Sequence, residues 1–385
     1  MDPSSLFRTA ALFQATDPRD KVYALVAFES LNFHRFWRIR VDYKLTTAQV
    51  YCQATAGCIL QSKGLNILYH IHHGDTNLDE PFSTPGRSLI EGEFATWVPQ
   101  LKGVHYSNAF AWEERWTAHG ELVTAFEEDD AEYQKFHVRG VEPSRHGNHE
   151  HVPLHYHTSQ VVSAIQCPRD SSIKTLKVRG IQVDVAISGS MPLNPAWWDP
   201  KHKNFTPVLL SLLNDMQVSR QPDLESQTTM ERAQGILSSI LQATIEDDDT
   251  SRNQLRLYWS YVVNVVKTMR GKTLPPDFYN TFPGLTSLTE EQMRQGEEWV
   301  ARVQQYTCYR RVFRTCRGIW GNGPSSMRAN DIVVVVYGII VPLVLRPSGD
   351  KWQLVGTCYL HGYMHGLAVE EFKMGKLEMQ VFEIE

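Results

Sequence analysis

The segment "DIVVVVYGIIVPLVLRP", from Asp331 to Pro347, is the longest strongly apolar run of the chain. Gly338 and Pro342 interrupt the run, and neither half approaches the roughly 20 apolar residues that a membrane-spanning helix needs. Short apolar runs bounded by turn residues are typical of buried strands. The segment therefore predicts two buried strands rather than a membrane anchor.

Similar short runs lie on both sides of this segment. "RRVFRT" (310–315), "KWQLVGTCYLHG" (351–362) and "LEMQVFEIE" (377–385) are separated from it by Gly, Pro, Asn and Asp turn residues. Far upstream, "IKTLKVRGIQVDVAISG" (173–189) alternates apolar and polar residues with the period of half-buried strands. Several short strands with intervening turns predict a small antiparallel sheet or barrel.

Helical spacing dominates other parts of the chain. Apolar residues recur at helical intervals over 20–28, and a helix is predicted from about Thr47 to Ser62. The pattern is also helical from about 205 to 270. "LTEEQMRQGEEWVARVQQY" (288–306) predicts an amphipathic helix with Thr289 as its N-cap.

Together these patterns predict an α+β protein with a helical middle region and a C-terminal antiparallel β-sheet or small barrel. We expect one compact body rather than independent domains. Its expected regions are an N-terminal helical segment with an ordered loop anchored by Trp97 (1–100), a β-rich region with a histidine-rich loop (101–200), a helical region (201–305) and a barrel-like region (306–385).

The composition limits the classes of function. An apolar fraction of 42% and an aromatic fraction of 11% indicate a folded protein with a sizeable core. A net charge of −5 without a basic run excludes the usual footprint of nucleic-acid binding. The N-terminus lacks the pattern of a signal peptide, and the six cysteines are scattered without a CxxC motif. We therefore expect a cytoplasmic protein with reduced thiols and no membrane insertion.

Several segments resemble fungal heterokaryon-incompatibility (HET) proteins, in the region downstream of their effector domain. The N-terminal match is "ATDPRDKVYALVAF" (15–28) followed by "VDYKLTTAQVY" (41–51). The longer, more specific match runs "RRVFRTCRGIWGNGPSSMRANDIVVVVYGIIVPLVLRP" (310–347) and continues "WQLVGTCYLHGYMHGLA" (352–368). In typical members the effector lies upstream of the DPRD segment. Because Met1 stands only sixteen residues before Asp17, the resemblance implies that the effector is absent here.

His361 and His365 stand four residues apart, a spacing that puts two ligands on one face of a helix. Gly362 and Gly366 beside them favour a strand followed by a turn instead, and no motif nearby supplies the further ligands of a zinc site. We favour the strand–turn interpretation and predict no metal here. A pocket histidine that donates a hydrogen bond or acts as a general acid or base remains an alternative.

A second histidine-rich stretch, "HGNHEHVPLHYH", covers 146–157. In a loop such density binds metal adventitiously, whereas in a strand His151, His155 and His157 would lie on one side. We favour a surface loop, and the sequence leaves open whether it binds metal.

Other motifs predict structure rather than chemistry. Arg346 follows apolar strand residues, so we expect it to pair with a carboxylate such as Asp331 or Glu370, or with a ligand oxygen, and we favour the carboxylate. "RGIWGNGP" (317–324) has neither the spacing of a dinucleotide fingerprint nor a P-loop lysine, and predicts a tight turn in which Trp320 covers apolar residues. Neither GxSxG nor HExxH occurs in the chain.

Two functional hypotheses remain. The first is a cofactor-independent enzyme of fungal secondary metabolism, a cyclase, isomerase or Diels–Alderase, which preorganises a small apolar natural-product substrate. Its candidate residues are the donors His361, His365, Tyr359 and Arg346, and the pocket walls Trp97, Trp320, Tyr337 and Tyr363. The second is a HET-family regulatory or interaction protein of heterokaryon incompatibility and cell death, without catalysis. The sequence favours the first slightly, names no substrate and does not set the oligomeric state.

Overall fold

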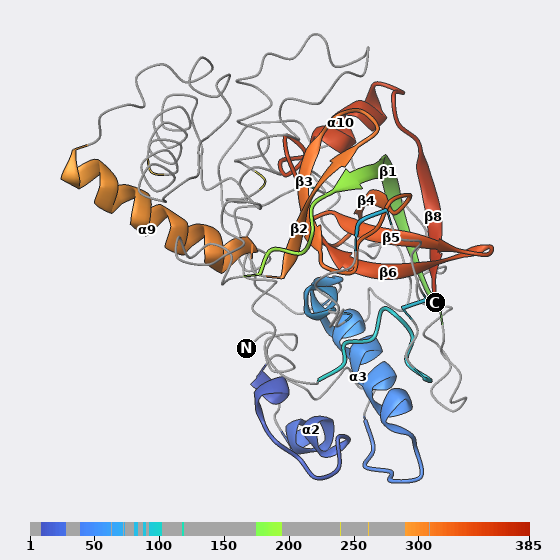
Figure 1. Ribbon diagram of the computed structural model, residues 1–385. Helices are drawn as coiled ribbons and strands as arrows, with labels where there is room; N and C mark the ends of the chain where they lie inside the picture. The colour runs from blue at the N-terminus through green and yellow to red at the C-terminus, as the bar shows by residue number, and fades with distance from the viewer. Residues whose placement is uncertain are drawn as a thin grey trace, which may run out of the picture.

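The computed structural model in Figure 1 describes residues 9–27, 39–62, 64–71, 73, 81–83, 88–89, 92–101, 118, 175–194, 239, 261, 289–307 and 309–385. Its helical elements are α2 (Asp20–Tyr23), η1 (Ala24–Ala27), α3 (Thr47–Ser62), η3 (Asn66–His70), α9 (Glu290–Thr307) and α10 (Leu367–Lys373). Its strands are β1 (Leu176–Gly189), β2 (Arg310–Thr315), β3 (Trp320–Pro324), β4 (Ile332–Val336), β5 (Leu343–Ser348), β6 (Lys351–Thr357), β7 (Tyr359–Leu360) and β8 (Met379–Ile384). The histidine-rich stretch and most of the predicted helical middle region lie outside the described residues.

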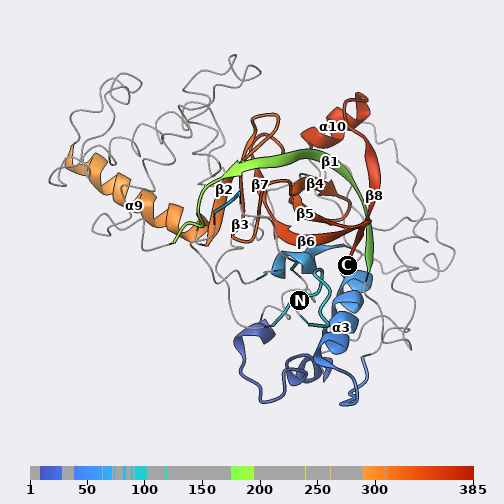
Figure 2. The same ribbon diagram turned by 45° about the vertical axis from the view of Figure 1, so that its right-hand side comes forward.

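Strand β1 is the element around which the sheet closes. Its first half pairs antiparallel with β8, from Leu176 opposite Ile384 onward, and its middle pairs antiparallel with β4. Strands β4, β5 and β6 follow as antiparallel neighbours, and β6 meets β8 in parallel at Trp352 and Ile384. The path β1–β4–β5–β6–β8 returns to β1 and forms a closed barrel, in which β1 arches over β4, β5 and β6 (Figure 2).

The end of β1 starts a second group of strands. After an irregularity between Ala186 and Ser188, β1 pairs with β2, and β3 and β7 continue the sheet. Only Cys358 separates β7 from β6, so one stretch of chain pairs first with β5 and then with β3. The predicted C-terminal antiparallel sheet or small barrel is therefore confirmed for the described strands.

One local prediction was wrong. The tight turn expected over 317–324 covers only its first residues, and β3 runs from Trp320 to Pro324. Glycine weakens strands in general, so "WGNGP" does not look like one. Here the lack of a side chain is required, because a Cβ at Gly321 would lie 2.3 Å from Cζ of Phe313 and 2.7 Å from the carbonyl oxygen of Tyr359.

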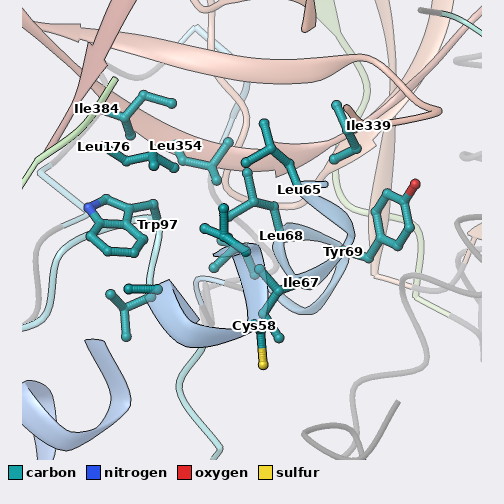
Figure 3. Packing of buried hydrophobic residues seen from close by; sticks show 14 of the residues in the cluster. Cys58, Leu65, Ile67, Leu68, Tyr69, Trp97, Leu176, Ile339, Leu354 and Ile384 are labelled. Atoms are coloured by element: carbon teal, nitrogen blue, oxygen red, sulfur yellow. The ribbon is translucent and has the colours of Figure 1, made fainter. Parts of the chain in front are cut away.

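Both faces of β4 are buried. Along β4, Ile332, Val334 and Val336 belong to one apolar cluster, whereas Val333 and Val335 belong to another. The first cluster joins the barrel to the N-terminal elements α3 and η3. Figure 3 shows Trp97 beside Leu176, Leu354 and Ile384, with Leu65 and the η3 residues Ile67, Leu68 and Tyr69 nearby. Trp97 is completely buried in this cluster.

The N-terminal elements agree with their predicted positions. Helix α3 has the predicted bounds, and α2 with η1 covers the helical pattern that begins at Asp20. The turn before α2 is fixed by Arg19, whose guanidinium binds the Asp17 carboxylate and donates to the carbonyl oxygens of Tyr43 and Leu45, each at 2.7 Å. The DPRD segment therefore holds the loop before α3.

In the described part of the chain no helix is both long and apolar enough to cross a membrane. Of the six cysteines, Cys52, Cys58, Cys316 and Cys358 are described, and all four are free thiols. The division into four regions that form one body stays a prediction.

Candidate functional site

The turn that carries His361 and His365 follows β7 and precedes α10. The backbone N–H of His361 donates to the carbonyl oxygen of Trp320 at 2.9 Å, and His361 and His365 are both surface residues. The Nδ1 atom of His361 lies 3.3 Å from the hydroxyl of Tyr359, and desolvation by surrounding atoms lowers the pKa of His361. The histidines thus occupy a turn, as predicted, and not one face of a helix. Two members of the predicted donor set, Tyr359 and His361, are therefore in contact.

Arg346 lies elsewhere, on β5, and is buried. Its Nε and Nη2 atoms donate to the two carboxylate oxygens of Asp331 at 2.8 and 2.9 Å, and Nη2 also donates to the carbonyl oxygen of Ser326. The backbone N–H of Arg328 completes the shell around Asp331 at 2.8 Å. Desolvation raises the pKa of Asp331, opposed by its hydrogen bonds with Arg346. The predicted pairing of Arg346 with Asp331 is confirmed, and it ties β5 to the turn before β4.

Trp97 and Tyr337 lie in different apolar clusters. Trp97 packs in the core between the barrel and the N-terminal elements. Tyr337 is half-buried against Ile181 and Val369, and its hydroxyl donates to Sδ of Met379 at 3.3 Å. These two aromatic residues therefore do not share one wall.

Trp320 and Tyr363 each have a cation beside the ring. The Arg314 guanidinium lies 6.0 Å from the Trp320 ring centroid, and that of Arg317 lies 5.7 Å from the Tyr363 ring centroid. The Tyr363 hydroxyl donates to Oε2 of Glu371 at 2.9 Å. The structure does not gather the predicted pocket walls around one space, and their role as substrate contacts stays a prediction.

Sequence reasoning missed three further buried cations. Arg310 and Arg311 are 1% and 0% exposed, and Arg328 is also buried. Arg311 and Arg328 donate to the carbonyl oxygen of Ser325, at 2.5 and 2.9 Å. Paired arginines at the start of an apolar strand were the available signal, because strands rarely bury arginine without a structural reason.

The interaction that holds α10 was also missed. Arg317 makes two hydrogen bonds with the carboxylate of Glu371, at 3.1 and 2.8 Å, and the backbone N–H of Arg317 donates to Asp184 on β1. The hydrogen bond with Arg317 is the main cause that lowers the pKa of Glu371. Burial raises the pKa of Tyr363, which shares Glu371 with Arg317. This group, Arg317, Tyr363 and Glu371, connects the turn between β2 and β3 and the turn before α10 with helix α10 itself.

Among the described residues, no group of three or more His, Cys, Asp and Glu side chains is arranged to hold a metal ion.

Comparison with known families gives the C-terminal region a class. Residues 286–374 match the family model of the Het-6 beta-barrel domain. The match includes α9 and the strands β2–β7, so the barrel fold and the family model coincide over this part of the chain. The resemblance to the C-terminal region of HET proteins is confirmed. No curated protein and no solved structure matches the chain.

Proposed function

We propose that this chain is a HET-family regulatory or interaction protein of heterokaryon incompatibility and fungal cell death, and that it acts without catalysis. The match of residues 286–374 to the Het-6 beta-barrel domain carries the proposal. Of the two hypotheses drawn from the sequence, we therefore prefer the interaction protein over the cofactor-independent enzyme.

The geometry supports this preference. Arg346, a predicted catalytic donor, holds Asp331 in a buried ion pair, and the predicted wall residue Trp97 fills the core between barrel and helices. Tyr363 is engaged with Glu371 and Arg317. These side chains have structural partners, and an orienting pocket would need several of them around one cavity. The cyclase, isomerase or Diels–Alderase hypothesis has no further observation in its favour among the described residues.

The test is a comparison of isogenic fungal strains with and without the gene. We expect deletion to change cell death after fusion with incompatible strains, while the metabolite profile by mass spectrometry stays the same. Complementation with the wild-type gene or with Asp350→Asn, an exposed site, restores the response. Asp331→Asn, which removes the carboxylate that pairs with Arg346, does not restore it.

The opposite outcome is equally specific. If fusion is unchanged, one compound disappears and an isomer of equal mass accumulates, the proposal is wrong. The isomer would then be the substrate of a cyclase or isomerase, and His361→Ala would be the first variant to assay for lost turnover.

A further inference from the structure

Strand β8, at the side of the barrel in Figure 1, pairs fully along one edge only. Its residues Met379–Ile384 pair with β1 in an unbroken antiparallel register, whereas β6 pairs with β8 only at Trp352 and Ile384. The N–H of Glu385 donates to the carbonyl oxygen of Trp352, and the carbonyl oxygen of Glu385 accepts from the N–H of Thr96, both at 2.9 Å. The backbone of Glu385 therefore faces away from β1.

The alternation of a strand extends this direction to other residues of β8. Backbone groups of every second residue point to the same edge, so Glu383, Val381 and Met379 also point away from β1. The facing strand agrees, because the carbonyl oxygen of Arg179, opposite Val381, accepts from the N–H of Tyr337 beyond β4. In the described part of the chain, the outward N–H and C=O groups of Met379 and Val381 have no hydrogen-bond partner.

Edge strands usually carry a feature that prevents pairing with another chain, such as a proline, a bulge or a lysine. The sequence of β8, MQVFEI, contains neither proline nor lysine, and its pairing with β1 has no bulge. Its one charged residue, Glu383, forms ion pairs with Lys177 at 3.2 Å and Lys351 at 3.7 Å. Val381 is 46% exposed, and Gln380 beside it is also exposed. The first half of β8 is therefore an accessible, uncharged edge to which a further strand can add.

The residue pattern of this edge favours a second copy of β8 as the added strand. When two copies pair antiparallel about a two-fold axis at Gln380, Met379 of one copy lies opposite Val381 of the other. These are outward-pointing residues, so each such pair exchanges two backbone hydrogen bonds, and the two apolar side chains cover one another. In the same register Glu378 and Glu383 each fall opposite an apolar residue, so no like charges face one another.

We propose that the chain forms a homodimer in which the β8 strands of two copies pair antiparallel through their outward edges at Met379–Val381. The partner is a second copy of this chain. The inference is independent of the proposed function, because it rests only on the direction, the exposure and the register of β8.

Sedimentation equilibrium of the full chain over a range of concentrations tests the proposal. We expect the wild type to be a dimer at micromolar concentration. Val381→Pro removes the outward N–H and leaves the hydrogen bonds with β1 in place, since proline is tolerated where the N–H of an edge strand faces solvent. The variant should self-associate about 30-fold more weakly, the value expected when a dimer loses two backbone hydrogen bonds.

A second variant keeps every backbone group. Val381→Lys places like charges close to the two-fold axis and should also be monomeric. The matched control is Val41→Lys, which makes the same change at a residue that is 56% exposed and lies before α3. It should stay dimeric, and circular dichroism checks that all three variants are folded.

Oxidation of Gln380→Cys tests the register. The axis places the two new thiols directly opposite one another at a position that is not hydrogen-bonded, where Cα atoms are about 4.5 Å apart, within the range of a disulfide. We expect a disulfide-linked dimer in a background that carries Cys316→Ser, because Cys316 is an exposed thiol.

Four results would overturn the proposal. A wild type that is monomeric at every concentration would leave the edge to a partner of another kind. A dimer that persists in both Val381→Pro and Val381→Lys would place the interface elsewhere. Equal loss of dimer in Val41→Lys would assign the association to general surface hydrophobicity. A dimer that Gln380→Cys does not cross-link would contradict the register.

Discussion

Asp331 receives two hydrogen bonds from Arg346 and one from the backbone of Arg328, in a place where water does not reach. A buried ion pair of this kind adds little net stability, because both charges lose their hydration when the protein folds. Removing one partner has a much larger effect, since the other charge then stays buried without compensation.

We therefore predict that Asp331→Asn lowers the free energy of unfolding by about 3–5 kcal/mol. Asparagine keeps the shape of aspartate but not its charge. The lost stability therefore measures the cost of burying the charge of Arg346 without a counter-charge. Urea denaturation measures the loss, with the exposed Asp350→Asn as a control that changes stability by less than about 0.5 kcal/mol.

The double variant Asp331→Asn with Arg346→Met completes the cycle. It should regain part of the lost stability, because the uncompensated charge is gone. If the double variant were less stable than Asp331→Asn alone, the buried charge would not be the cause.

For individual residues, the sequence predicts only some of the buried charges. Arg346 is predictable because it ends an apolar strand and has Asp331 within the same segment. Arg310 and Arg311 were not predicted, because the acceptors described for them include carbonyl oxygens from distant segments, such as those of Thr357 and Ser190. No residue type in the sequence marks a carbonyl oxygen as the partner of an arginine.

Helix α10 is a short element attached by an ion pair in addition to its buried apolar residues Ala368 and Val369. It has seven residues, and a helix of this length is not stable alone in water. Its Glu371 binds Arg317 in the turn between β2 and β3 and accepts from Tyr363 in the turn before the helix. The docking of α10 is therefore linked to the ionisation of Glu371.

We predict that acid weakens this docking. The folded state lowers the pKa of Glu371 below its ordinary value of 4.5, so its contribution is complete above that pH and is lost as the pH falls through the lowered value. Between pH 6 and pH 3, wild type should lose about 1 kcal/mol more stability than Glu371→Gln, a modest figure because Arg317 is partly exposed.

Urea unfolding at each pH and hydrogen exchange of the α10 amides follow the change. Glu378→Gln removes an exposed carboxylate near the same helix and should keep the wild-type pH dependence. An identical acid response in Glu371→Gln and wild type would assign the effect to other carboxylates.

The elements differ in how far the sequence predicts them. Helices α3 and α9 carry caps and helical periodicity, and both were predicted; Thr289 caps α9 by accepting from the N–H of Gln292 at 3.2 Å. Strand β3 was not predicted, because glycine is unusual in strands. At Gly321 it is required by the close contact of Phe313 and of the Tyr359 carbonyl oxygen, which the sequence does not show. The candidate site was predicted as separate residues, and its arrangement depends on strand pairing between distant segments, which periodicity does not encode.

For the whole molecule, the barrel closes at Gly180. This residue of β1 pairs with Val336 of β4 on one side and with Gln380 of β8 on the other. A Cβ at this position would lie 2.7 Å from the carbonyl oxygen of Val335 and 3.1 Å from Cγ2 of Val336. Strand β4 would have to shift to accommodate any side chain here.

We predict that Gly180→Ala destabilises the protein by about 3 kcal/mol or more, in the range of strong overpacking. Gly349→Ala is the comparison, since it introduces only the strain of a positive φ in open space and should cost about 1–2 kcal/mol. Circular dichroism during urea unfolding measures both. If Gly180→Ala were no worse than Gly349→Ala, the contact between β1 and β4 would be looser than the structure indicates.

The pairing of β1 with β8 has a kinetic consequence. The two strands are joined by nearly two hundred residues of chain, so a large loop must close before their first hydrogen bonds form. Folding with such distant contacts is slow. During synthesis β1 leaves the ribosome long before β8. Because chain elongation proceeds at about 5–20 residues per second, the edge of β1 that later pairs with β8 stays unpaired for about ten seconds or more. Over that interval the nascent chain exposes an unpaired strand, which makes it a substrate for chaperones before it becomes a folded barrel.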